Sequence, residues 1–465
     1  MTAEEQIPTL ALEGGATLFN ADHLRQGQEE QARVTARGIA RALDLMQVRA
    51  AGIAPRDLTA GVDFLRDLDR SHSLSWLSMN LVDRKTEQTV FAPFKIVTVG
   101  GIRIGLLGLT DVQARAGDRF RLLPWEDVLP GIVEQLAERT DMIILLSSYP
   151  ESVNTRIARS QKNIHIILQA GHRAVNQSPK QVNNTLLCRT GARGKYQGML
   201  RISWNREKTW GESLEDRRKK VQSQLDRISW QLHRLEKRLP REQLRSEIRY
   251  NRLLRQREEL ETTLQGLATD RTATSPCTYR NRLIALKTSL PEDPEVGKIV
   301  DEIRVTVNRL NRKMLSRSRQ QADSPLQAVT GWRKCAECHP EQADFWLQTG
   351  HATAWQTLAE ADQEFNRECL VCHVTLPSYK SQQPDLTEQL SALDRSLKNV
   401  GCESCHGPGR EHARSPETAL MAAINTATCL QCHTAEHDDH FDFREKLNKI
   451  RCPAAGKGGS PATGT

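Results

Sequence analysis

The apolar residues of the first 205 positions form short runs that alternate with stretches of helical periodicity. Continuously apolar runs predict strands buried on both faces, whereas periodic stretches predict amphipathic helices. The predicted strands are Pro8–Phe19, Phe91–Thr110, Asp141–Ser147 and Ile164–Gln169. The predicted helices between them include Glu30–Met46 and Trp125–Arg139. Buried strands alternating with helices predict a layered α/β domain over residues 1–205.

Residues 206–268 carry a narrow apolar stripe in a highly charged background. Leu239-Pro240 interrupts the pattern, and Pro240 suits the first turn of a following helix. The pattern predicts a coiled-coil-like antiparallel hairpin of two helices. The stripe residues are Val221, Leu225, Ile228, Leu232, Leu235 and Leu239, followed by Leu244, Ile248, Leu260 and Leu264.

Residues 269–330 contain turn signals, a helical pattern over Glu295–Leu315 and a polar stretch typical of a linker. We therefore assign 269–330 as a helix and linker, and 331–452 as a further, mainly helical domain. The Gly-, Pro- and Ala-rich residues 453–465 predict a disordered tail.

The net charge of +8 is distributed unevenly. Residues 201–265 hold 17 Lys and Arg against 11 Asp and Glu, whereas residues 331–465 hold 13 against 18. Because the basic surplus of residues 201–265 is offset by an acidic C-terminal domain, a general nucleic-acid-binding function is not indicated. Two interpretations of the hairpin remain open: a solvated structural element, or a basic arm that docks an acidic partner or the acidic C-terminal domain.

Four Cys-x-x-Cys-His motifs follow one another in the C-terminal domain at intervals of 34, 33 and 27 residues. In this motif two thiols one helical turn apart add to the heme vinyl groups, and the adjacent histidine binds the iron as proximal ligand. Zinc sites built from paired Cys-x-x-Cys would not require a histidine after every second cysteine. The sequence thus predicts four covalently bound heme c groups. The thioether residues are Cys335, Cys338, Cys369, Cys372, Cys402, Cys405, Cys429 and Cys432, and the proximal ligands are His339, His373, His406 and His433.

The sixth ligands of the four irons must come from outside the motifs. The C-terminal domain has four further histidines, His351, His412, His437 and His440, and a single methionine, Met421. Mostly bis-histidine ligation follows, which lowers reduction potentials relative to His/Met cytochromes.

Three stretches of the C-terminal domain resemble the cytochrome c-554-type tetraheme proteins. They are Thr349-Gly-His351-Ala, Cys369-Leu-Val-Cys372-His373-Val-Thr, and Asn399-Val-Gly-Cys402-Glu-Ser-Cys405-His406-Gly-Pro-Gly. The resemblance implies that His351 and His412 are distal ligands, that the hemes form stacked pairs, and that the protein relays electrons. Sequences resembling this family often carry a further histidine after the last motif, where this chain has Cys452. We therefore expect one heme to be ligated differently, and Cys452 is a candidate ligand.

The first 205 residues resemble the 5′-nucleotidase branch of the calcineurin-like metallophosphatases. The similar stretches are Gly61-Val-Asp-Phe-Leu65, Leu77-Ser-Met-Asn80-Leu, Ile104-Gly-Leu-Leu-Gly-Leu-Thr110 and Gly191-Ala-Arg-Gly-Lys-Tyr-Gln-Gly198. That family uses two metal ions to activate water and polarise a phosphate. Most of its ligands are missing here, because the matching positions are Ala16, Pro55-Arg56, Ser148 and Ala174, and only His172 is retained. We expect an inactive fold kept for docking or regulation, and no catalytic residue.

These observations leave three functional hypotheses. The first is an extracytoplasmic, periplasmic electron carrier whose partners are quinol oxidase- or reductase-type proteins or other cytochromes. The second is a heme redox enzyme that acts on a small nitrogen or oxygen compound at an open iron. The third is a metal-dependent nucleotidase with an attached cytochrome. Heme attachment follows export, yet no signal peptide is visible at Met1, so we expect the true start upstream. Membrane association is then expected only through that missing segment.

Overall fold

The computed structural model divides into two compact units, residues 1–24 with 39–292 and residues 25–38 with 293–465. The residues that the structure describes are 7–25, 27–111, 116–170, 176–191, 194–211, 214–238, 240, 243–244, 247–269, 276–287, 289–318, 328–375, 395–434, 437–438 and 441–453.

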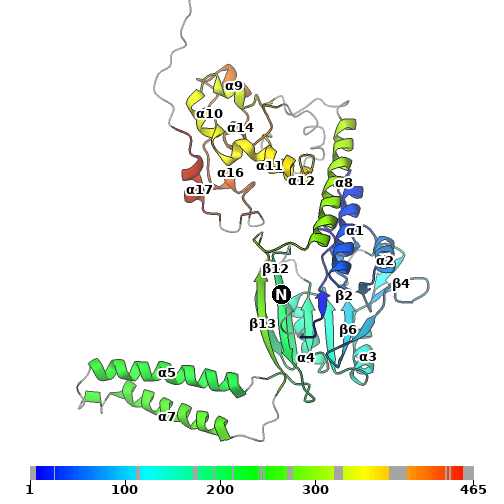
Figure 1. Ribbon diagram of the computed structural model, residues 1–465, viewed down its shortest axis with the longest axis vertical. Coiled ribbons are helices and arrows are strands. Elements are labelled where there is room, and N and C mark those ends of the chain that lie inside the picture. Colours follow the sequence, from blue (N-terminus) through cyan, green and yellow to red (C-terminus); the bar gives the residue numbers. More distant parts are fainter. Residues whose placement is uncertain are drawn as a thin grey trace, which may run out of the picture. The chain divides into compact units, whose positions relative to one another are not determined.

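A six-stranded sheet forms the centre of the first unit (Figure 1). Its strand order is β10-β11-β9-β8-β6-β5, with parallel pairing from β11 to β6 and antiparallel strands at both edges. The apolar stretch 91–110 therefore supplies two strands that pair as a hairpin. The strands are β5 (Phe94–Val99), β6 (Ile102–Leu109), β8 (Met142–Ser147), β9 (Ile166–Gln169), β10 (Gln177–Val182) and β11 (Thr185–Arg189).

Both faces of this sheet are buried, which explains the continuously apolar strands. Ile143 and Leu145 face a cluster with helix α3 (Trp125–Ala137) and helix α4 (Glu151–Ser160). Ile144 and Leu146, one residue out of phase, belong to the cluster on the opposite face, which also contains Ala50 and Leu77. The α/β layered fold predicted for this region is confirmed.

A parallel three-stranded sheet covers part of that second face. Its strands are β1 (Ala11–Glu13), β2 (Val48–Gly52) and β3 (Ser75–Leu77). Only the centre of the predicted strand Pro8–Phe19 is extended in this way. Gly52 allows close packing, because a Cβ atom there would lie 2.5 Å from the Gly14 carbonyl oxygen. Helix α1 (Glu29–Leu45), the 3-10 helix η1 (Pro55–Leu58), helix α2 (Val62–Ser71) and the β4 (Leu81–Asp83) and β7 (Phe120–Leu122) pair complete the elements between residues 29 and 122.

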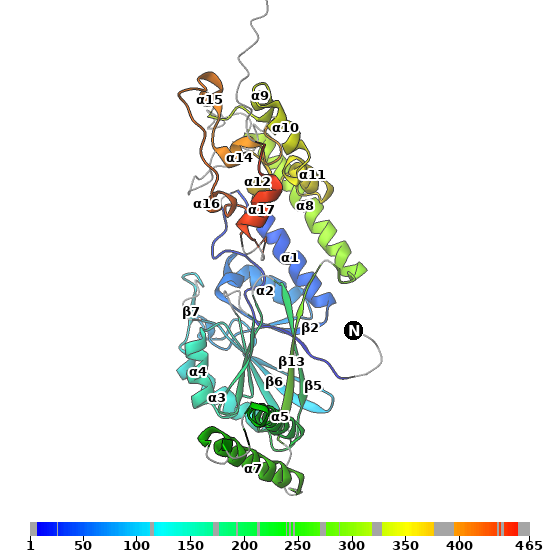
Figure 2. The same ribbon diagram turned by 90° about the vertical axis from the view of Figure 1, so that its left-hand side faces the viewer.

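The predicted helical hairpin is inserted between two paired strands. Strands β12 (Tyr196–Ser203) and β13 (Thr278–Ala285) pair antiparallel over their whole length, and helices α5 (Leu214–Arg238) and α7 (Ile248–Thr269) lie between them in the sequence. Both views show α5 and α7 side by side (Figures 1 and 2). Leu225, Leu232 and Leu244 of the predicted stripe are buried, and so is Leu253, which was not predicted. Ile248 was wrongly placed in the stripe, because its side chain is 84% exposed.

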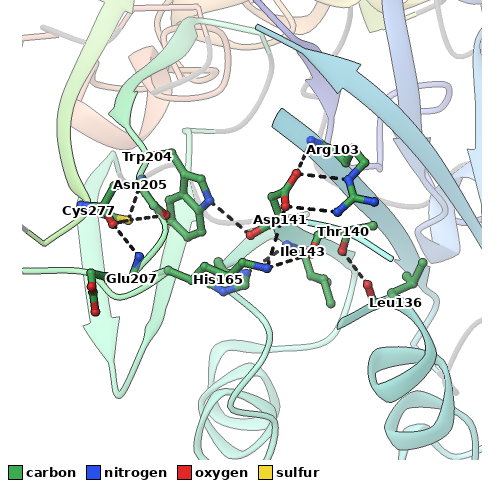
Figure 3. Close-up of polar contacts among 11 residues, drawn as sticks. Arg103, Leu136, Thr140, Asp141, Ile143, His165, Trp204, Asn205, Glu207 and Cys277 are labelled. Carbon is green, nitrogen blue, oxygen red and sulfur yellow. Dashed lines mark hydrogen bonds and ion pairs between the residues drawn. The ribbon is translucent and has the colours of Figure 1, made fainter. Parts of the chain in front are cut away.

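A histidine is buried beside the central sheet (Figure 3). The Ile143 amide donates to His165 Nδ1 at 3.0 Å, and the His165 ring makes an edge contact with Trp204. Trp204 Nε1 in turn donates to the Asp141 carbonyl oxygen at 3.2 Å. Burial, with a smaller effect of the Lys208 charge, lowers the pKa of His165 to about 4. The folded state therefore requires an unprotonated Nδ1 on His165, which accepts the hydrogen bond from Ile143.

This histidine should make the first unit less stable in acid. The unfolded chain binds the proton near pH 6.5 and the folded chain only near pH 4, so stability falls as the pH drops between these values. The expected loss is about 3 kcal/mol. Amide hydrogen exchange of the peptides covering β8 and β9, corrected for the slower intrinsic exchange in acid, should show protection factors that fall over this window and then level off. His165→Asn, which keeps an acceptor for Ile143, should remove the contribution of this histidine to the pH dependence. His23→Asn, at an exposed position, should retain it.

The second unit consists of helix α8 (Pro294–Ser318), the beginning of α1 and a series of short helices (Figure 2). Asn308 of α8 accepts from the Phe365 amide at 3.1 Å and donates to Glu364 at 3.0 Å. A small apolar cluster contains Val329, Leu358, Leu370, Val374 and Leu397. The segment predicted as helix and linker therefore contributes α8 to this unit. In the described part of the chain, no helix is long and apolar enough to cross a bilayer.

Candidate functional site

Short helices present the Cys-x-x-Cys-His motifs. The first cysteines lie on α9 (Trp332–Ala336), α12 (Arg367–His373), α14 (Cys402–His406) and α16 (Thr426–Cys429). Asn366 and Asn425 cap α12 and α16 by accepting from backbone amides, which fixes where these two helices begin. In α12 and α14 both cysteines lie within the helix, and their spacing of three residues, close to one turn, places both thiols on one side. The two thiols and the adjacent histidine of each motif thus suit the covalent attachment and ligation of heme c.

Two motif histidines face a histidine from outside the motifs. The ring centroids of His339 and His412 are 6.2 Å apart, and the rings are inclined by 16°. Those of His351 and His433 are 6.3 Å apart, with an inclination of 51°. Imidazole nitrogens lie about 2 Å from a bound metal and about 1 Å from their ring centroid, so two rings that share one metal have centroids about 6 Å apart. Both separations therefore match rings that share one iron.

Hydrogen bonds at Nδ1 orient several of these rings. His373 Nδ1 lies 2.7 Å from the Ala354 carbonyl oxygen, and His412 Nδ1 lies 2.8 Å from that of Ala419. Since a carbonyl only accepts, each Nδ1 carries the proton and donates. Nε2 is then unprotonated and available to a metal, as heme ligation requires. Burial, together with the nearby His433, also lowers the pKa of His351, which favours its neutral form.

The motif thiols show which attachment sites are neighbours. Cys335 of the first motif is hydrogen-bonded to Cys402 of the third, which raises the pKa of Cys335 and lowers that of Cys402. Cys372 of the second motif is hydrogen-bonded to Cys432 of the fourth, which lowers the pKa of Cys372 to about 7. These thiols become thioethers on heme attachment, so the contacts matter as evidence of proximity. Motif 1 lies beside motif 3, and motif 2 beside motif 4.

A buried carboxylate lies between the cysteines of the third motif. Glu403 is 2% exposed. It accepts from the amides of Gly331 at 2.7 Å, Gly409 at 2.7 Å and Thr330 at 2.9 Å. Three amide donors offset the cost of removing one charge from water. The sequence analysis did not single out Glu403, although the position of a charged residue between the two cysteines of the motif could have drawn attention to it.

The second and third motifs have no matching partner among the described histidines. No ring contact joins His373 or His406 to another described histidine. His437 is exposed, and His440 lies outside the described residues. Cys452 is exposed but close enough to Cys402 and Cys405 for their charges to interact, which places it near the third motif.

In the N-terminal unit, polar side chains near the positions that match the metallophosphatase ligands are hydrogen-bonded within the chain. Asp57 is buried and accepts from four backbone amides at 2.7–3.1 Å, although burial raises its pKa. The donors are the amides of Ala16, Thr17, Leu18 and Ala54. Asp57 therefore has its oxygen atoms committed to the backbone.

Two further polar side chains of this region are also engaged in hydrogen bonds within the chain. Asn80 donates to the Thr110 and Leu123 carbonyl oxygens and accepts from the Thr110 amide. Ser148 Oγ accepts from the Asp111 amide. Across the part of the chain that the structure describes, no group of three or more His, Cys, Asp or Glu side chains could hold a metal ion, and His172 lies outside that part. The described residues do not fit a dinuclear metal centre.

Comparisons with known proteins agree with the geometry of the second unit. The family described as "Cytochrome c554 and c-prime" matches residues 334–407. Cytochrome c-554 of Nitrosomonas europaea is 35% identical over 146 residues, which cover 27% of this chain and 57% of that protein. The C-terminal part of the chain is a c-type cytochrome domain. More particularly, residues 334–407 are similar to the cytochrome c554 family, which implies covalently bound heme c, and the chain spans just over half the length of this relative.

Solved structures similar to the chain include the sulfate thiohydrolase SoxB of Thermus thermophilus in complex with glycerol, at 20% identity and a TM-score of 0.38. The similarity covers 42% of this chain and 36% of that one. A 5′-nucleotidase precursor, also from Thermus thermophilus, has 21% identity, a TM-score of 0.37 and 44% coverage of each chain. These neighbours have metallophosphatase-like α/β folds. At this level of similarity they concern the fold alone, and no activity is transferred from them.

Proposed function

We propose that this chain is an extracytoplasmic tetraheme c-type cytochrome that passes electrons between redox proteins, with an inactive 5′-nucleotidase-like domain used for docking or regulation. The proposal rests on the observation that two motif histidines each face a histidine distant in the sequence, at the separation expected across one iron. Bound heme supplies reversible one-electron chemistry. The chain supplies the thiols, the paired imidazoles and the hydrogen bonds that orient them.

Neighbouring attachment sites support a relay. The thiol contacts bring motif 1 beside motif 3 and motif 2 beside motif 4, so hemes held there are close pairs between which electrons can pass. In this proposal, His339 and His412 ligate the first heme, and His351 and His433 ligate the fourth. His437, His440 and Cys452 remain the candidates for the second and third.

The heme count tests the proposal directly. Intact-mass analysis of the protein matured in an exporting host should show four heme additions, because four complete motifs are present. Cys402→Ser should prevent full attachment at the third motif, whereas Cys188→Ser, outside the motifs, should leave four additions. Two or fewer additions in fully matured wild-type protein would contradict a tetraheme cytochrome.

A heme redox enzyme is the second candidate, favoured by His373 and His406, which have no described partner ring. An iron without a sixth protein ligand could bind a small nitrogen or oxygen compound. A fully six-coordinate, low-spin protein supports the relay, whereas a high-spin heme that binds such compounds supports the enzyme. A nucleotidase is disfavoured, because the carboxylate oxygens of Asp57, which would otherwise be able to bind a metal, accept hydrogen bonds from backbone amides.

Cys452 gives the third motif a distinctive prediction. If its thiolate binds that iron, electron donation lowers the potential, and Cys452→Ala should change the electron paramagnetic resonance signal of one heme. Cys188→Ala, at a cysteine of the first unit, is the matched control. Identical bis-histidine low-spin signals in the wild type and in Cys452→Ala would exclude the thiolate ligand.

The helical hairpin supplies a surface for docking in this proposal. Arg227, Trp230 and Arg234 are exposed at helical spacing on α5, and the Arg234 guanidinium lies 5.5 Å from the Trp230 ring centroid. A basic face with one exposed aromatic residue suits an acidic redox partner. Electron transfer to such a partner should then slow at high salt.

A further inference from the structure

The fourth motif differs from the others in the group that its histidine contacts. His433 Nδ1 lies 3.0 Å from Asp438 Oδ2, which is a carboxylate. The corresponding partners of His373 and His406 are carbonyl oxygens, those of Ala354 at 2.7 Å and Ala422 at 3.4 Å. Among these three motif histidines, only His433 has a negatively charged partner.

The local fold holds Asp438 in this position. Its amide donates to the Thr434 carbonyl oxygen at 2.8 Å, which ties Asp438 to the residue that follows His433. Phe441 stacks on the His433 ring, with centroids 5.2 Å apart and an inclination of 26°. The Asp438 side chain is only 18% exposed. The carboxylate is therefore built into the site rather than free in solvent.

A cation from the following helix contacts the same carboxylate. Lys446, on α17 (Phe443–Ile450), has its Nζ 3.2 Å from Asp438 Oδ2, the oxygen that faces His433. A lysine that shares this oxygen draws electron density away from the histidine contact. Asp438 and Lys446 should thus act on His433 in opposite directions.

A carboxylate partner makes a metal-bound imidazole more basic, because it draws on the Nδ1 proton. A more basic axial ligand donates more electron density to iron and stabilises the oxidised state, which lowers the reduction potential. The two carbonyl partners carry no net charge and have a weaker effect of this kind.

We propose that Asp438 is a positioning residue that lowers the reduction potential of the heme attached at Cys429 and Cys432, and that Lys446 limits this effect. The inference rests on the proposed function, since it requires a heme whose iron is bound by His433. Within the neighbouring pair formed by motifs 2 and 4, it makes the fourth heme more reducing than it would be with a neutral partner. Asp438 thereby biases the distribution of electrons within that pair.

Spectroelectrochemical titration of the full-length matured protein tests this assignment. Asp438→Asn keeps an oxygen acceptor for His433 but removes the charge, and it should raise the midpoint potential of one heme and leave the other three unchanged. The low-spin electron paramagnetic resonance signal of the same heme should shift as well. Lys446→Met should lower that potential.

Asp442→Asn is the matched control. The Asp442 side chain caps α17 by accepting from the Glu445 amide at 2.8 Å, so the variant perturbs the same helix without altering the carboxylate that contacts His433. Unchanged potentials in Asp438→Asn, an equal shift in Asp442→Asn, or a raised or unchanged potential in Lys446→Met would each overturn the proposal. These outcomes are interpreted in protein with four attached hemes. Fewer hemes in the wild type would instead contradict the proposed function.

Discussion

Replacing His412 by alanine should convert one heme of the matured protein from a low-spin, six-coordinate to a high-spin, five-coordinate state. His412 faces His339 with nearly parallel rings 6.2 Å apart, so removing its imidazole leaves that iron with only the proximal ligand. Optical and electron paramagnetic resonance spectra should show the loss of one low-spin signal and the appearance of one high-spin signal. The reduction potential of that heme should rise, because an electron donor has been lost.

His351→Ala should have the same effect on the heme bound by His433, and the double variant should convert two hemes. The two lost signals should differ, since the rings are inclined by 16° in one pair and 51° in the other. Glu411→Gln, on the same short helix as His412, is the control and should leave all spectra unchanged. A His412→Ala protein with four hemes and an unaltered low-spin spectrum would show that His412 is not an iron ligand.

Replacing Glu403 by leucine should destabilise the cytochrome domain by about 3–5 kcal/mol, because it leaves three amides without their acceptor. These amides belong to Thr330 and Gly331 at the start of the domain and to Gly409 after the third motif. The substitution therefore loosens two segments around the same attachment site. Denaturant unfolding followed by heme absorbance measures the change.

Glu411→Leu provides the comparison, because its carboxylate is 76% exposed and pairs only with Arg414 within the described contacts. It should change stability by less than about 0.5 kcal/mol. Glu403→Gln, which retains one acceptor oxygen, should lie between the two and remains measurable if Glu403→Leu does not mature. Equal stabilities of the Glu403 and Glu411 variants would refute a structural role for the buried carboxylate.

Local sequence determined the features whose chemistry depends on neighbouring residues. The heme motifs are recognisable because both thiols and the proximal histidine lie within five positions. The hairpin is recognisable because residues three and four apart share one helix face, and Leu225 and Leu232 are indeed buried. The sheet strands 142–147 and 166–169 are recognisable because both of their faces are buried.

The sequence was less informative where a segment is short or where its partner is distant. Residues 8–19 are apolar enough to predict one strand, yet only 11–13 pair with β2, because the following amides turn to meet Asp57. The pairing of β12 with β13 closes a long helical insertion, and no local pattern specifies such a contact.

Only the tertiary structure decided how the candidate heme ligands are paired and how their surroundings differ. The sequence supplied His351 and His412 as candidates, but packing of distant segments brings His412 to His339 and His351 to His433. Packing likewise places the Glu403 carboxylate among three amides and Asp438 against the fourth proximal histidine. The physical reason is that heme attachment is a covalent pattern within a few residues, whereas ligation and tuning depend on side chains that meet only when the chain has folded.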